Sequence, residues 1–272
     1  MKKLVLILIF GTLLYSQIAI ACCAGDYIGI FPRSINISSN ATFLIDFAEQ
    51  DFALKNKISD LVFTAITTKG KCFKLTVLET NFSGTMGQVF LKVKSNLKLG
   101  DTIVINVSLL NEDTLSGKIK KFASIISLRK WVVKFQTDNE IPAWVSDTIS
   151  YSTDDSRNSS APGYSINFNP KVTDNSITSD NYKLSGKLSL PFFYEVTLGN
   201  QKFICSADGG NPGIYSSICG SNFIFAIDKS YPATVKIIDA SGNFALQEKT
   251  LVFKTIGFSQ DIIIINNNER NH

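Results

Sequence analysis

Histidine is almost absent from this chain, with one residue among 272, and that one is His272 at the end. Ser-His-Asp and Cys-His arrangements need an imidazole as their base, so nucleophilic hydrolases of that kind are excluded. Zinc and copper sites use histidine or paired cysteines, and the 5 cysteines form no C-x-x-C motif. We therefore expect no catalytic residues, no metal ligands and no cofactor.

Dense basic clusters and long apolar runs are also scarce. The chain has 27 Lys and Arg against 23 Asp and Glu, a formal net charge of +4. No stretch resembles a phosphate-tracking surface, so nucleic acid is not an expected partner. No apolar segment after the N-terminus is long enough to span a bilayer. A composition that is 44% hydrophobic with 20 Phe indicates a globular protein with a large core.

The N-terminus has the pattern of an export signal, predicted over residues 1–21. Lysines precede an apolar run over residues 4–15, and Ala19 and Ala21 are small residues before a cleavage point. Cys22 follows, and this segment resembles the lipobox of bacterial lipoproteins, in which the cysteine receives a diacylglycerol, although Ala19 replaces the preferred Leu. Ordinary cleavage after Ala21 is the alternative. We expect an outer-membrane or cell-surface lipoprotein or, alternatively, a periplasmic or secreted protein.

Lipidation of Cys22 leaves an even number of cysteines for pairing. Cys205 and Cys219 bracket a turn-rich segment that suits a local disulfide in an oxidising compartment. Cys23 with Cys72 would then tie the N-terminus to the first domain. The alternative for all of them is a reduced, buried and unpaired thiol.

Alternating apolar and polar residues predict β-strands in the first half of the chain. These segments are residues 73–78, 89–94, 102–109 and 131–136, with turn signals between them. We expect one face of each strand to be exposed to solvent. Residues 114–128 are predicted as either a short helix or a Lys-rich hairpin.

A second set of strand-like segments follows the polar, proline-ended joint at 137–142. The candidates are residues 148–151, 164–168, 192–198, 202–205, 223–227, 234–239 and 246–253, with a surface loop at 152–163. This spacing predicts an all-β fold of two β-sandwiches. The predicted domains span 22–138 and 139–258, and a tail follows at 259–272.

Several segments carry a resemblance to known modules. Residues 30–32, the L-K-L-G-D-T sequence at 97–102 and residues 135–138 resemble the bacterial Ig-like domains of the CopC/SbsA type. The D-x-x-G-N sequence at 239–243 is similar to a turn of other Ig-like modules. The resemblance implies two Ig-like β-sandwich domains in tandem. Copper carriage is not implied, because copper-binding members of the CopC group use histidine ligands that the body of this chain lacks.

Loop residues of the second domain are the candidates for binding. Asn211 and Tyr215 lie between Cys205 and Cys219, and Trp144 follows the joint; aromatic side chains in such places can contact a protein or a sugar. We interpret Asp239–Asn243 as a turn rather than a metal site. The predicted function is a non-catalytic cell-envelope binding or structural module, whose partner is an envelope protein or polysaccharide. The alternatives are a secreted carbohydrate-binding or calcium-dependent adhesion module and, third, an envelope hydrolase with paired carboxylates.

Overall fold

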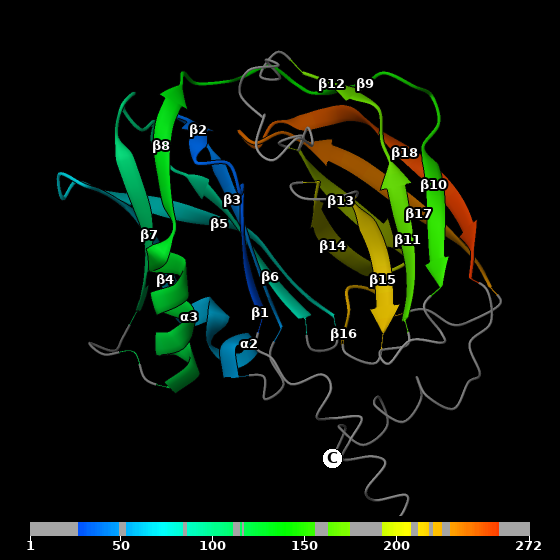
Figure 1. Cartoon of the computed structure of the whole chain (residues 1–272), viewed down its shortest axis with the longest axis horizontal. Coiled ribbons are helices and arrows are strands. Elements are labelled where there is room, and N and C mark those ends of the chain that lie inside the picture. The colour runs from blue at the N-terminus through cyan, green and yellow to red at the C-terminus, as the bar shows by residue number, and fades with distance from the viewer. Residues whose placement is uncertain are drawn as a thin grey trace, which may run out of the picture.

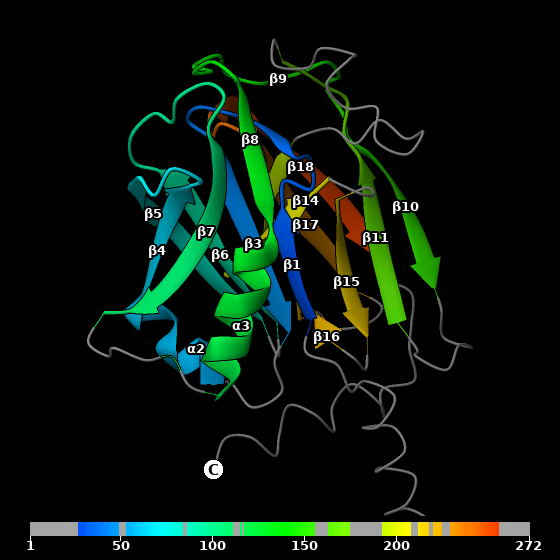
Figure 2. The same ribbon diagram turned by 60° about the vertical axis from the view of Figure 1, so that its left-hand side comes forward.

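The structure is a computed structural model. It describes residues 27–48, 53–83, 86–110, 115, 117–155, 163–174, 192–207, 212–217, 220–224 and 229–255. Within these ranges β-strands predominate, which confirms the predicted all-β class. Figures 1 and 2 show two lobes side by side. We call the described residues up to Asp138 lobe 1 and those after it lobe 2.

Lobe 1 is a single sheet that folds over its own core. Its strands are β1 (Tyr27–Phe31), β2 (Asn36–Ser38), β3 (Thr42–Ala48), β4 (Leu61–Thr67), β5 (Cys72–Ser83), β6 (Met86–Val93), β7 (Thr102–Leu109) and β8 (Lys130–Phe135). They are hydrogen-bonded in the order β1-β3-β6-β5-β4-β7-β8-β2. Strand β5 pairs with β4 near its start and with β6 along the rest, so it joins the two halves of the sheet. Buried side chains such as Phe43, Phe63 and Trp131 fill the space between these halves.

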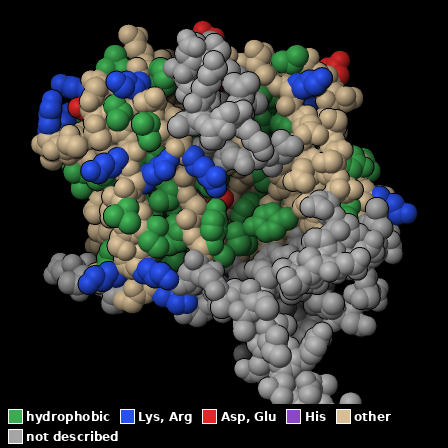
Figure 3. Space-filling model, in the orientation of Figure 1, with side chains coloured by type: hydrophobic (Ala, Val, Ile, Leu, Met, Phe, Trp, Pro, Cys, Tyr) green, Lys and Arg blue, Asp and Glu red, His purple; other side chains and the backbone are tan. Residues whose placement is uncertain are grey.

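Two helices lie together at one end of lobe 1. Helix α2 (Ala53–Lys57) continues into the 3-10 turn η1 (Ile58–Asp60), and α3 (Gly117–Leu128) packs beside α2. Phe122 and Ile126 of α3 are fully buried in the core. The segment predicted as a helix or a hairpin is therefore a helix, because its apolar residues recur at helical spacing. Figure 3 shows lysine and arginine side chains at this lower corner of the lobe.

Lobe 2 is a sandwich of two sheets. Its strands are β9 (Ala143–Trp144), β10 (Ser150–Asp155), β11 (Gly163–Asn169), β12 (Val172–Thr173), β13 (Phe193–Leu198), β14 (Gln201–Ser206), β15 (Gly213–Ser217), β16 (Gly220–Ser221), β17 (Ser230–Ile238) and β18 (Phe244–Lys254). The sheets have the orders β14-β13-β17-β18 and β10-β11-β15-β16, and β12 pairs with β9. Phe168, Tyr194 and Phe223 are among the side chains buried between them.

Some predicted strand boundaries are wrong. Residues 152–155 continue β10 instead of beginning the loop, and residues 223–224 lie outside any strand, whereas β15 was not predicted. The alternation over residues 73–78 places Val77 on the same face as Phe73, yet Val77 is 41% exposed. The register of β5 against β6 shifts between Val77 and Glu79, so Val77 and Leu78 lie together at a β-bulge, and both are exposed.

The expectation of one solvent-exposed face per strand is also wrong in the middle of the molecule. The alternation over residues 89–94 places Phe90 on the same face as Lys92 and Lys94, opposite Val89 and Leu91. Val89, Phe90 and Leu91 are nevertheless all buried. Leu44 on β3 is buried in the same way. These strands are covered on both faces because lobe 2 packs against the outer face of lobe 1.

The two lobes have separate cores, each drawn almost wholly from its own half of the sequence. The assignment of two Ig-like domains stays a prediction. The signal peptide at 1–21 and the tail at 259–272 lie outside the described residues. Among the helices that the structure does describe, none has both the length and the hydropathy of a membrane span.

Candidate functional site

A group of polar and apolar contacts lies between the lobes, and we call it the lobe interface. Its centre is an apolar cluster separate from both cores, formed by Phe31, Leu44 and Phe90 of lobe 1 and Phe193, Ile204 and Ile238 of lobe 2. The rings of Phe90 and Phe193 meet edge to face with their centroids 5.5 Å apart. Such aromatic pairs add about 0.5–1.5 kcal/mol beyond the area they bury. Each residue belongs to a strand whose neighbouring residues point into a lobe core, so the period of two creates this second apolar face.

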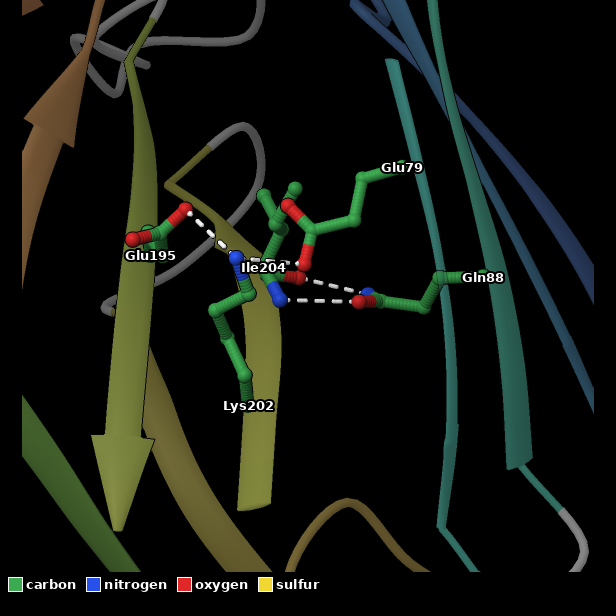
Figure 4. A network of polar contacts seen from close by, with 5 residues as sticks. All are labelled: Glu79, Gln88, Glu195, Lys202 and Ile204. Carbon is green, nitrogen blue, oxygen red and sulfur yellow. Dashed lines mark hydrogen bonds and ion pairs between the residues drawn. The ribbon is translucent and has the colours of Figure 1, made fainter. Parts of the chain in front are cut away.

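Gln88 connects the two lobes through its side-chain amide. It is fully buried on β6, and its Nε2 donates to the Ile204 carbonyl of β14 at 2.5 Å while its Oε1 accepts from the Ile204 N–H at 2.8 Å (Figure 4). The side chain thus satisfies both backbone groups of Ile204, as a neighbouring strand would. Its Nε2 also donates to Oδ1 of Asp46 on β3 at 2.7 Å. Because a buried polar group without a partner costs about 1–3 kcal/mol, this arrangement fixes the register of the two sheets.

A charged triplet lies beside Gln88. Nζ of Lys202 on β14 is 2.7 Å from Glu79 of β5 in lobe 1 and 3.3 Å from Glu195 of β13 in lobe 2 (Figure 4). Partial burial alone would lower the pKa of Lys202, but hydrogen bonds and attraction from Glu79 and Glu195 raise it above its ordinary value. Lys202 is still 39% exposed, so this triplet aligns the lobes more than it stabilises them.

The D-x-x-G-N segment forms the turn that its sequence predicts, between β17 and β18. The fully buried Asp239 accepts hydrogen bonds at 2.8 Å from the backbone N–H groups of both Ser241 and Asn243. The Asn243 side chain donates to Asp239 Oδ2 at 2.7 Å. We call residues 239–243 the docking turn, because its outer side contacts lobe 1.

The docking turn attaches to the connection between β2 and β3. The Ala240 carbonyl accepts from the Thr42 backbone N–H at 2.8 Å and from its hydroxyl at 3.0 Å. The hydroxyl groups of Ser38 and Ser241 are 2.8 Å apart. Gly242 has a φ of +81°, and a Cβ there would lie 2.5 Å from Cγ2 of Thr42. Both its conformation and its closeness to lobe 1 therefore require glycine.

The joint between the lobes is fixed at the same corner. The Asp138 carbonyl accepts from the side-chain amide of Asn40 in lobe 1 at 2.7 Å and from that of Asn243 in lobe 2 at 3.1 Å. Oδ1 of Asn40 accepts in return from the Asp138 N–H at 3.2 Å. The chain therefore crosses between the lobes in one defined conformation.

Three carboxylates gather beside this joint. Asp138, Asp174 and Asp239 each place an oxygen within 4.8 Å of the others. Burial raises the pKa of Asp239 to about 6; the hydrogen bonds from Asn243 act against the rise, and the charges of Asp138 and Asp174 add to it. Oδ2 of Asp138 is buried and has no hydrogen-bond partner among the residues that the structure describes. Carboxylate oxygens at this spacing are the ligand type that calcium prefers.

The structure describes one cysteine of each predicted pair. Cys72 is an exposed thiol, and Cys205 is a buried thiol whose Sγ donates to the Gly213 carbonyl at 3.1 Å. Burial raises the pKa of Cys205 to about 12, with that hydrogen bond acting in the opposite direction. The other cysteines, Cys22, Cys23 and Cys219, lie outside the described residues. Lipidation and both disulfides therefore stay predictions.

The structure describes two of the predicted binding residues, Trp144 and Tyr215. The Trp144 indole N–H donates to the Gln247 carbonyl at 3.0 Å, and Trp144 packs against the core of lobe 2. Tyr215 is 36% exposed, and burial and the charge of Asp46 raise the pKa of its phenol. Asn211 lies outside the described residues. Trp144 holds β9 against β18, and Tyr215 lies toward the lobe interface.

Sequence reasoning missed the residues that build the interface. Gln88 occupies a polar position on a face expected to be exposed, and the 38–42 connection reads as an ordinary polar loop. One signal was available. The runs Phe43-Leu44-Ile45 and Val89-Phe90-Leu91 are apolar without alternation, which is typical of strands buried on both faces.

Comparison with known proteins shows distant likeness only. No protein-family model matches the chain, and no curated protein matches it. A pullulanase from Anoxybacillus sp. LM18-11 is similar at 7% identity, over 82% of this chain and 25% of that one, with a TM-score of 0.24. A putative membrane anchored protein from Corynebacterium diphtheriae is similar at 11% identity, over 87% of this chain and 55% of that one, with a TM-score of 0.23.

A DUF4785 family protein from Legionella pneumophila is similar at 8% identity, over 85% of this chain and 56% of that one, with a TM-score of 0.21. The chain thus spans between a quarter and just over half of the length of these structures. Likeness at these TM-scores assigns no function, so the functional argument depends on the chain itself.

Proposed function

We propose that this chain is a non-catalytic binding or structural module of a bacterial cell envelope. It is exported, tethered through a lipid on Cys22, and its two lobes act as one rigid unit that binds an envelope protein or polysaccharide. The export signal, the lipobox-like segment and the lobe interface support this proposal.

The observation that carries the proposal is how the buried polar side chains are used. Gln88 bonds to the backbone of Ile204, Asn40 bonds to the backbone of Asp138, and Asn222 bonds to the backbone of Gly213 at 2.9 Å. These three buried amides use their hydrogen-bonding groups to hold backbone segments together. This use of buried polar side chains supports a structural or binding module.

The tether is tested by expressing the full chain in a bacterium supplied with labelled palmitate. We expect label in the wild type and in the matched control Cys23→Ser, and none in Cys22→Ser. Cys22→Ser should also leave the detergent phase, because two acyl chains give stable anchoring and their loss removes it. An unlabelled wild type, or label that persists in Cys22→Ser, contradicts the lipoprotein assignment.

The binding role is tested with the exported protein and insoluble envelope polysaccharide. Co-sedimentation without release of reducing ends supports a non-catalytic module. Release of reducing ends that rises with protein concentration contradicts it and favours the hydrolase alternative.

Calcium-dependent adhesion is the second candidate function. It is favoured by the buried Oδ2 of Asp138, which has no partner within the described part of the chain and lies beside Asp174 and Asp239. The test compares thermal unfolding in calcium and in EDTA. A ligand present at about 100 times its Kd stabilises the native state by about 2.7 kcal/mol. We expect that gain in the wild type and in Asp147→Asn, whose carboxylate pairs with Lys249 elsewhere, and its loss in Asp174→Asn. Equal unfolding temperatures in both buffers rule this candidate out.

A further inference from the structure

Asp46 occupies an unusual place for an acidic residue. It lies on β3 in lobe 1, and its Oδ1 accepts a hydrogen bond from Gln88 Nε2 at 2.7 Å. The same Nε2 donates to the Ile204 carbonyl of lobe 2. The carboxyl group is therefore one side chain away from the backbone contact that joins the lobes, and any change in its charge acts directly on the shared donor.

Neutral groups face this carboxyl from the neighbouring strands. They are Tyr27 of β1, Cys205 of β14 and Tyr215 of β15, and burial first and then the negative charge of Asp46 raise the pKa of each of them. Arg33 hydrogen-bonds to Tyr27, and its charge and hydrogen bond act against the rise in the pKa of Tyr27. Burial raises the pKa of Asp46 itself to about 7, with the Gln88 hydrogen bond acting against the rise. Asp46 as a whole residue is partly exposed to solvent, but its carboxyl group lies within the packed interface. The burial of that group is what raises its pKa.

We propose that Asp46 makes the packing of the two lobes depend on pH: its carboxyl group takes up a proton at the lobe interface, which strengthens the interface, and releases it at higher pH, which weakens the interface. The ionised form leaves a negative charge among apolar and neutral groups, while the protonated form removes that charge and keeps the Oδ1 acceptor for Gln88.

The sign follows from the two pKa values. An exposed aspartate has a pKa of about 3.9, so separated lobes hold this proton less tightly than packed ones. The stabilising effect is complete below about pH 4, declines as the pH rises, and is lost once the pH passes about 7. At pH 7 about half of the packed molecules carry the proton, against about one in a thousand for an ordinary aspartate.

The experiment records NMR spectra of the labelled protein between pH 5 and 9. The Ile204 amide and the Gln88 side-chain amide should shift together with one midpoint near pH 7. Asp46→Asn should abolish this shift. Asp60→Asn, which changes an exposed carboxylate next to Lys57 far from the interface, should leave it intact. Observing the Asp46 carboxyl carbon in the wild type gives the same midpoint without any variant, so the test holds even where Asp46→Asn does not fold.

Three results would overturn the proposal: an Asp46 carboxyl that titrates near pH 4, an Ile204 amide that does not move between pH 5 and 9, or a midpoint that Asp46→Asn retains. None of these measurements depends on the lipid anchor or on a ligand. Failure here therefore leaves the proposed envelope function untouched, and failure of the palmitate experiment leaves this proposal untouched.

Discussion

Replacing Gln88 by alanine should destabilise the protein more than an average core substitution. The change removes both partners of Ile204 and the donor to Asp46, in a position with no exposed surface. Each buried group left without a partner costs about 1–3 kcal/mol, and the lost volume adds a cavity term. The expected loss is about 3–5 kcal/mol of the free energy of unfolding, a large share of the about 5–15 kcal/mol that typical proteins have. Urea denaturation of the exported protein, followed by fluorescence, measures it.

Gln201 provides a matched control for this prediction. Its side chain bonds to both backbone groups of Ile224, with Nε2 to the carbonyl at 2.6 Å and the N–H to Oε1 at 2.7 Å. These bonds are open to solvent, so water replaces them when the side chain is removed. Gln201→Ala should cost less than about 1 kcal/mol. Equal losses in Gln88→Ala and Gln201→Ala would refute the claim that burial between the lobes gives Gln88 its importance.

Two further changes test the docking turn and the predicted disulfide. Gly242→Ala should cost about 2–4 kcal/mol, because it combines a left-handed backbone with a contact against Thr42. Gly70→Ala, at a φ of +80° in open space, should cost only about 1 kcal/mol; matching thermal shifts in the two variants would contradict docking of the turn onto lobe 1. Non-reducing peptide mapping of the exported protein should recover Cys205 linked to Cys219, with a gain of about 3 kcal/mol over the reduced form. Recovery of both as free thiols would disprove the disulfide.

The strands were predictable wherever burial follows a simple alternation. Ile103, Ile105 and Val107 are buried as their period of two predicts, and the same holds for Trp131 and Val133. The local sequence pattern is sufficient to predict burial there, because each strand has one face in contact with solvent and one face in the core. The turn at 239–243 was also predictable, since Gly allows a positive φ and the side chains of Asp and Asn hydrogen-bond to nearby backbone groups in turns.

The candidate site could not be predicted in the same way. Hydrogen bonds such as those between Gln88 and Ile204 join residues 116 positions apart. Nothing in the local sequence of Gln88 distinguishes a solvent-facing amide from one that completes the backbone bonding of a distant strand. The carboxylates of Asp138, Asp174 and Asp239 likewise meet only because the docking turn lies against the joint.

The two ends of β3 have different surroundings, and this determines the shape that the protein offers to its neighbours. Tyr27, the first described residue, pairs with Ala48 at the end of β3 that precedes the helices, whereas Thr42 at the other end receives the docking turn. At about 3.3 Å per residue these ends are about 20 Å apart. The two lobes lie side by side (Figure 1). If the chain is attached to a surface through its N-terminal segment, the second lobe therefore lies beside the first lobe on that surface and not above it. The second lobe then widens the area that the protein covers on that surface and does not add to its height.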